Sequence, residues 1–238
     1  DKSEVTVMIP PGYSPGNYAP RPSELTKFSE AKIYFSMGVP ADVQNILPKV
    51  NQFNADIKII NLANLVGKKY ENRTFSNGSR DPHIWLSPKR VIYMVKIIRD
   101  ELIKLDPKNE EFYRDNAEEY IEKIRTTDQK IREIVEKKDN NYMLVYHPSF
   151  GYFADEYGLK MVSIEEGGKE ATAKHLQDII DFAKENGINK IFYQAEIDSR
   201  QTEAIAEEID AKLIKLDPLA EDYVANLIEM AKKISGVE

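Results

Sequence analysis

The chain has 238 residues, 42% of them hydrophobic, which allows one large domain or two ordinary lobes with real cores. Its net charge of −7 argues against a nucleic-acid-binding surface, which would need clustered lysine and arginine. The lack of cysteine excludes thiolate metal ligands, thiol nucleophiles and disulfides. No apolar run approaches the roughly 18 residues of a membrane span, and the first residues lack a signal-peptide pattern, so we expect any targeting segment to lie outside this sequence.

The first 62 residues of the chain are predicted to contain three short strands. They are the β-like runs at residues 5–9, 32–38 and 57–62. A loop rich in proline and glycine, residues 10–22, separates the first two and excludes regular structure there.

Two long helices are predicted in the middle of the chain. The first begins at Ser87-Pro88, because proline has the φ angle of a first helical turn, and ends at Asp106-Pro107. The second covers about residues 109–138, where an apolar stripe runs among many charged residues. At about 1.5 Å per residue this helix is long enough to cross a whole domain.

The last hundred residues alternate regularly between strands and helices, which predicts a parallel sheet covered by helices. The predicted strands are residues 142–146, 160–164, 190–194 and 212–216, and the predicted helices are 148–158, 171–187, 200–209 and 221–234. The pattern therefore predicts an α/β protein of two lobes. The chain is predicted to divide into an N-terminal lobe (1–108), a linking helix (109–138) and a C-terminal lobe (139–238).

Three side chains that can bind metal lie at junctions between strands and helices. His147 directly follows the strand at 142–146, Asp217 directly follows the strand at 212–216, and His83 precedes the helix that starts near Ser87. In open α/β sheets, ligands bind beyond the carboxyl ends of the strands. The third histidine, His175, falls inside an amphipathic helix, where a surface or packing role is expected.

Two imidazoles and one carboxylate suit zinc or another first-row divalent ion. Each residue also has an ordinary structural explanation. An Asp-Pro before a helix is a common cap, and a histidine between prolines and a tryptophan can simply bond a backbone carbonyl. Position alone leaves both interpretations open for His83, His147 and Asp217.

Several segments resemble the metal-binding lipoproteins that feed zinc and manganese ABC importers. The similarity covers nearly the whole chain and is carried by DPHIWLSP (81–88), YHPSFGYFADEYGL (146–159), AIAEEI (204–209) and LDPLAEDYVANL (216–227). The resemblance implies two parallel-sheet α/β lobes bridged by a long rigid helix, with the metal in the cleft between them. It implies that His83, His147 and Asp217 are metal ligands.

The chain departs from this family at the first ligand. The family has a histidine in a loop of the form P-H-x-Y-E-P-x-P, whereas residues 15–22 read PGNYAPRP. Gly16 occupies the place of the histidine and Ala19 that of the glutamate. Water, or a neighbour such as Glu165, Glu166 or Tyr13, would complete the site. Two further departures are an N-terminal lobe that starts about one βα unit late and the absence of histidine from residues 67–80, where zinc-type members often carry a His-rich loop.

The resemblance favours a metal-capture protein over two alternatives. The first is a member of the same fold that has drifted to another ligand or to adhesion, and the second is a mononuclear zinc hydrolase. It implies a non-enzymatic, monomeric, extracytoplasmic protein that delivers its metal to the membrane permease of an ABC importer. An N-terminal segment outside this sequence would anchor it to the membrane. Imidazole ligands favour zinc, with manganese and iron as the alternatives.

Overall fold

The computed structural model describes residues 3–165, 169–194 and 200–237. The chain forms two compact units that are not consecutive stretches of sequence. The first unit comprises Asp1–Asn72 and Lys89–Glu122, and the second comprises Arg73–Pro88 and Lys123–Glu238.

The first unit contains a two-stranded parallel sheet. Strand β1 (Ile33–Ser36) pairs with β2 (Lys58–Asn61) in the register Ile33 to Lys58. Helix α3 (Leu62–Lys69) starts directly after β2, and the Asn61 side chain caps it by accepting the Asn64 N–H. Such a cap satisfies one of the unpaired donors of a first helical turn, which fixes where the strand stops and the helix starts.

The predicted strand at residues 5–9 is wrong, since these residues form no strand. Val5 and Val7 are exposed, and only Met8 is buried, in a core cluster with Phe28 and Ile46. An alternating apolar pattern becomes a strand only when a neighbouring strand pairs with its backbone, and the described residues provide none here. The predictions at 32–38 and 57–62 are confirmed as β1 and β2.

Several helices of the first unit were not expected from the sequence. Helix α1 (Pro22–Glu30) begins at the last proline of the predicted loop and buries Phe28. A π-helical turn at Asp42–Ile46, a 3-10 turn at Leu47–Lys49 and the short α2 (Val50–Phe53) follow β1. These segments are too short for a helical period to stand out in the sequence.

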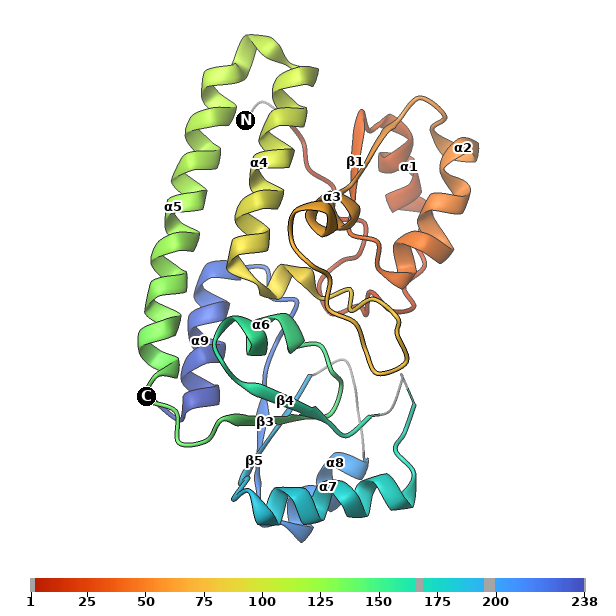
Figure 1. Cartoon of the computed structure of the whole chain (residues 1–238). Coiled ribbons are helices and arrows are strands. Elements are labelled where there is room, and N and C mark those ends of the chain that lie inside the picture. The colour runs from red at the N-terminus through yellow and green to blue at the C-terminus, as the bar shows by residue number, and fades with distance from the viewer. Residues whose placement is uncertain (1–2, 166–168, 195–199, 238) are drawn as a thin grey trace. The chain divides into compact units, whose positions relative to one another are not determined.

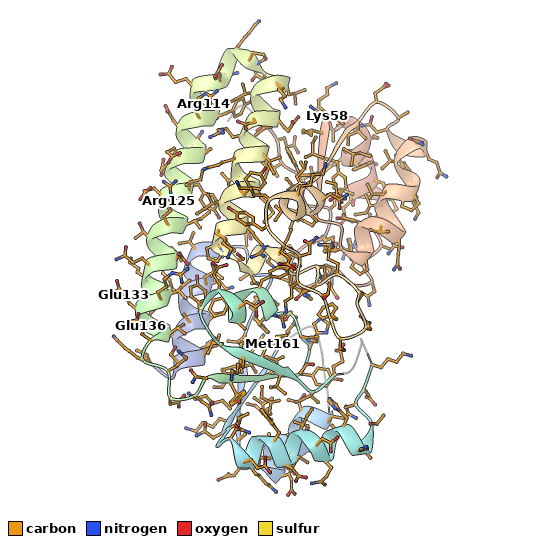
Figure 2. All side chains as sticks on the ribbon, in the orientation of Figure 1. Lys58, Arg114, Arg125, Glu133, Glu136 and Met161 are labelled. Carbon is orange, nitrogen blue, oxygen red and sulfur yellow. The ribbon has the colours of Figure 1, made fainter. Side chains whose placement is uncertain are left out.

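The two long helices are confirmed as α4 (Pro88–Leu105) and α5 (Glu110–Val135), joined by a 3-10 turn at Pro107–Asn109. An ion pair between Lys58 and Glu101 connects β2 to α4 within the first unit. Figure 2 shows Arg114, Arg125 and Glu133 along α5, and Glu136 directly after its end. Because α5 starts in the first unit and ends in the second, it is the helix that both units share.

The second unit is built on a four-stranded sheet with the order β4-β3-β5-β6, all parallel. Every strand and helix predicted for residues 142–234 is present, with shifted ends. They are β3 (Tyr142–Val145), α6 (Gly151–Glu156), β4 (Lys160–Ser163), α7 (Ala173–Glu185), β5 (Lys190–Tyr193), α8 (Arg200–Glu208), β6 (Lys212–Lys215) and α9 (Tyr223–Ser235).

Helices cover both faces of this sheet (Figure 1). Met143 and Val145 of β3 pack with α6, α9 and the end of α5, while Leu144 and Tyr146 pack with α7 and α8. This alternation follows from the two-residue period of a strand, and it buries the sheet on both sides as parallel sheets require. The predicted fold class, two α/β lobes with parallel sheets and a shared long helix, is confirmed. No helix among the described residues is both long and apolar enough to cross a membrane.

Candidate metal-binding site

His83 is held by a carboxylate two residues before it. Its ring Nδ1 lies 2.7 Å from Asp81 Oδ1, and the same oxygen accepts the His83 backbone N–H at 2.9 Å. The Asp81 side chain is fully buried. A carboxylate only accepts hydrogen bonds, so Nδ1 carries the proton and Nε2 keeps its lone pair. This is the tautomer that a metal ligand bound through Nε2 requires.

Aromatic side chains fix the plane of the His83 ring. The rings of Trp85 and Phe75 stand edge-on to it, at centroid distances of 5.3 Å and 6.4 Å. His83 also precedes a 3-10 turn at Ile84–Leu86, whose Ile84 and Leu86 are buried. The imidazole is therefore restrained from three sides, by Asp81, Trp85 and Phe75.

Trp85 ties this segment to the loop that carries Asp217. Its indole Nε1 donates to the Pro218 carbonyl at 2.8 Å, and the Tyr223 hydroxyl donates to the Trp85 carbonyl at 2.9 Å. Two hydrogen bonds thus hold residues distant in sequence in one place. The loop after β6 and the segment of His83 are neighbours for this reason.

His147 directly continues strand β3. The backbone just before it is fixed, because the Tyr146 N–H donates to the Phe192 carbonyl and the Tyr146 carbonyl accepts the Glu165 N–H. The His147 Nδ1 lies 2.9 Å from Glu165 Oε2, and the Glu165 side chain is only 7% exposed. A carboxylate therefore sets the tautomer of this imidazole too, and again leaves Nε2 for a ligand.

The two imidazoles lie side by side within the second unit, with ring centroids 5.4 Å apart and planes at 78°. Two imidazoles on one tetrahedral zinc ion have centroids roughly 5 Å apart, given Zn–N bonds of about 2.0 Å. A carboxylate or carbonyl on the second nitrogen is the usual companion of a metal-binding histidine, and both residues have one.

Burial lowers the pKa of the His83 imidazole, and this effect outweighs the hydrogen bond and charge of Asp81, which raise it. The ring is consequently neutral at pH 7, which is the form that binds metal.

The structure does not bring Asp217 into a closed set with the two histidines. Among the described residues, no three histidine, aspartate or glutamate side chains are grouped as a metal site. Asp217 Oδ1 accepts the Leu219 N–H at 2.8 Å. The residue also lines a pocket of about 420 Å³ against α9 that neither histidine lines. Its role as a ligand stays a prediction.

The other residues named from the sequence are placed as follows. Gly16 and Tyr13 belong to the first unit, where the Gly16 N–H donates to Ser14 Oγ. Glu166 lies outside the described residues. His175 lies in the first turn of α7, and its N–H donates to the capping Thr172.

Sequence reasoning missed the role of two carboxylates. Asp81 was noted only as part of the motif at residues 81–88, and Glu165 only as a substitute ligand. The available signal for Asp81 was its spacing, because an aspartate two residues before a histidine can bond both its ring and its N–H. Glu165 follows a different strand, so nothing local connects it with His147.

The fold and the paired histidines define a class, that of two-lobed α/β binding proteins with a metal-binding site. Residues 1–237 match the family described as "Zinc-uptake complex component A periplasmic" (ZnuA), and the chain belongs to this family.

Similar proteins agree with this assignment. The high-affinity zinc uptake system protein ZnuA of Bacillus subtilis (strain 168) is 30% identical over 231 residues, which are 92% of this chain and 72% of that protein. The zinc-binding lipoprotein AdcA of Streptococcus pneumoniae (strain ATCC BAA-255 / R6) is 28% identical over 92% of this chain, which spans only 46% of AdcA. A crystal structure of ZnuA superposes with a TM-score of 0.91 at 34% identity, covering 98% of this chain and 90% of that one.

Proposed function

We propose that this protein captures a divalent transition metal, with zinc favoured, and delivers it to an ABC importer without catalysing a reaction. The observation that carries the proposal is the pair of histidines. Each ring is fixed by a carboxylate on Nδ1, and the centroids are 5.4 Å apart. Membership of the zinc-uptake family supports the same function.

In this proposal His83 and His147 bind the ion through Nε2, Asp217 supplies the third ligand, and water completes the shell. Asp217 would have to exchange its bond to the Leu219 N–H, or use its second oxygen, to reach the ion. Trp85 supports this role, because its bond to Pro218 keeps the loop of Asp217 beside the segment of His83. A ligand set of two imidazoles and one carboxylate binds zinc more tightly than manganese.

The proposal includes an extracytoplasmic location, at the cell surface or in the periplasm, and a membrane permease as the partner. The family description "periplasmic" and the lipoprotein name of AdcA support the location. That the protein acts as a monomer is part of the same proposal.

The test uses all three histidines of the chain. We expect His83→Ala and His147→Ala each to weaken zinc binding by at least about 100-fold, because the remaining ligands cannot form a tetrahedral shell. His175→Ala is the matched control and should bind zinc as the wild type does, since its ring lies in α7. Calorimetry with Zn²⁺ and with Mn²⁺, together with elemental analysis of the untreated protein, gives the affinity and identifies the metal. Wild-type affinity in both His83→Ala and His147→Ala would remove the proposed function.

A further inference from the structure

Arg73 stands at one end of a short hairpin whose other end is Asp81. The Asp81 N–H donates to the Arg73 carbonyl at 2.8 Å, and an antiparallel bridge joins Thr74 to Arg80 inside the hairpin. The buried hydroxyl of Tyr152 accepts the Arg73 N–H at 2.9 Å and donates to the Asp81 carbonyl at 3.3 Å. The backbones of the two residues are thereby held side by side at the start of the metal-binding segment.

The Arg73 guanidinium reaches carboxylates on both sides. Its Nη1 donates to both oxygens of Asp155 at 2.7 Å, and its Nε lies 3.5 Å from Asp81 Oδ2. Asp155 is 59% exposed, whereas the Asp81 side chain has no exposed surface. The exposed pair is worth little, because water screens it, so the buried contact is the one with consequences.

The approach of Arg73 depends on a glycine. Gly151 is the first residue of α6, and a Cβ atom there would lie within 2.6 Å of Arg73 Cδ and 2.9 Å of Cζ. A side chain at this position would push the guanidinium away from Asp81. Gly151 has no positive φ, so close packing rather than backbone conformation requires glycine here.

We propose that Arg73 is a positioning residue for the metal ligand His83, and that it acts through Asp81. The two oxygens of the Asp81 carboxylate have different neighbours, since Oδ2 forms an ion pair with Arg73 at 3.5 Å, without a hydrogen bond, and Oδ1 accepts from His83. A buried carboxylate has no water to bond, so its partners alone set its rotation. Arg73 thus keeps Oδ1 against the imidazole. This inference rests on the proposed function, because it takes His83 as a ligand.

The first test removes the guanidinium and then restores a charge. We expect Arg73→Ala to weaken zinc binding about tenfold, the lower end of the range for residues that support a metal ligand. Arg73→Lys should recover part of this loss, because an ammonium can pair with Asp81 but lacks the planar fork. Arg132→Ala is the matched control. Arg132 is also an arginine of the second unit that pairs with an aspartate. Its partner is Asp128, and it lies over the Tyr157 ring rather than at the metal-binding site.

The second test displaces the guanidinium without removing any charge. We expect Gly151→Ala to weaken zinc binding to a similar extent as Arg73→Ala. In the Arg73→Ala background the same glycine substitution should have no further effect, because the side chain that it displaces is absent. A double-mutant cycle of this kind isolates the coupling of the two residues.

The third measurement separates positioning from stability and from the proposed function itself. In metal-free protein, ¹⁵N NMR of the His83 imidazole should show the Nδ1–H tautomer in the wild type and in Arg132→Ala, and a mixture of tautomers in Arg73→Ala. A folded Arg73→Ala variant with wild-type zinc affinity would overturn the proposal. If Arg73→Ala does not fold, Arg73→Lys and Gly151→Ala carry the same comparison. If the wild type binds no zinc, the proposed function fails, and the NMR signal alone then supports or overturns the positioning role.

Discussion

The two histidines of the site share one chemical arrangement but are supported in different ways. His83 takes its carboxylate from Asp81, two residues away, and the same oxygen also holds the His83 N–H. The carboxylate beside His147 is that of Glu165, which is 18 residues away in sequence and comes after β4. The first support is built into a single turn, whereas the second exists only when β3 and β4 pair. A local support can form before the sheet is complete, and a long-range support cannot.

The two carboxylates also differ in the charge beside them. In the described part of the chain, each has one buried oxygen without a hydrogen-bond partner, Oδ2 of Asp81 and Oε1 of Glu165. The Arg73 Nε lies 3.5 Å from Asp81 Oδ2 and forms an ion pair with it. An unpaired buried oxygen is costly, and the charge of Arg73 offsets this cost at Asp81, so we expect the support of His147 to be the weaker one.

The largest effect that can test this difference comes from removing each charge. We expect Asp81→Asn to weaken zinc binding about 30-fold and Glu165→Gln about tenfold, both within the usual range for residues that orient a ligand. An amide oxygen still accepts from Nδ1 but makes the imidazole a poorer donor to metal. Competition with a zinc chelator measures both affinities, and Asp155→Asn is the exposed control. A larger loss in Glu165→Gln than in Asp81→Asn would reverse the comparison.

The pH dependence of stability tests the environment of His83. Its pKa is lowered in the folded protein by burial, whereas the unfolded value is about 6.5, so the unfolded chain binds more protons just below that pH. The contribution of His83 to stability is therefore complete above about pH 6.5 and is lost as the pH falls toward the lowered pKa. Urea unfolding of the metal-free protein between pH 7.5 and 5 should show this loss in the wild type. His83→Gln should lack it, and equal pH profiles would contradict the assignment.

Zinc affinity should decline over the same range. Each imidazole that must give up a proton adds about a tenfold loss per pH unit below its pKa. Because burial lowers the pKa of His83, we expect its share of the decline to begin at a lower pH than for an ordinary histidine. A flat affinity down to pH 5.5 would mean that carboxylates alone hold the ion.

Gly16→His extends the comparison to the position where the family has a third imidazole. If the loop at residues 15–22 faces the metal, we expect about tenfold tighter zinc binding, because a fourth protein ligand would replace water. Gly16 has no positive φ, and a Cβ there would meet only Ser14 Oγ, at 3.2 Å. The backbone therefore tolerates the change. Gly16→Ala is the control for the loop, and unchanged affinity in a folded Gly16→His variant would show that the loop does not face the ion.

The smallest expected effect concerns the link between the segments of His83 and Asp217. Trp85→Phe keeps an aromatic ring beside His83 but loses the donor to the Pro218 carbonyl. We expect a loss of about 1 kcal/mol in the free energy of unfolding, the usual net value of one hydrogen bond. Zinc affinity should fall only a few-fold if Asp217 is a ligand. Tyr223→Phe removes the second hydrogen bond of this link, and we expect the same changes in stability and zinc affinity from it. Urea unfolding and chelator competition measure the two quantities, and an unchanged affinity would count against Asp217.

The sequence by itself determined the strands and helices of residues 142–234 and the place of His147 among them. Alternating strands and helices from residue 142 onward, and a histidine directly after β3, depend on local periods and on chain order, which any reader of the sequence can follow. The conformation around His83 is also local, since Asp81, Pro82 and Trp85 lie within four residues of one another.

Only the tertiary structure decided which partners those residues acquired. Glu165 meets His147 because two strands pair in one register, and Arg73 reaches Asp81 because Gly151 leaves room for it. The segment 5–9 has the pattern of a strand yet forms none, and residues 73–88 belong to the second unit although the chain on both sides of them belongs to the first. Hydrogen-bond partners and packing are set by residues far apart in sequence, and a local period contains no information about them.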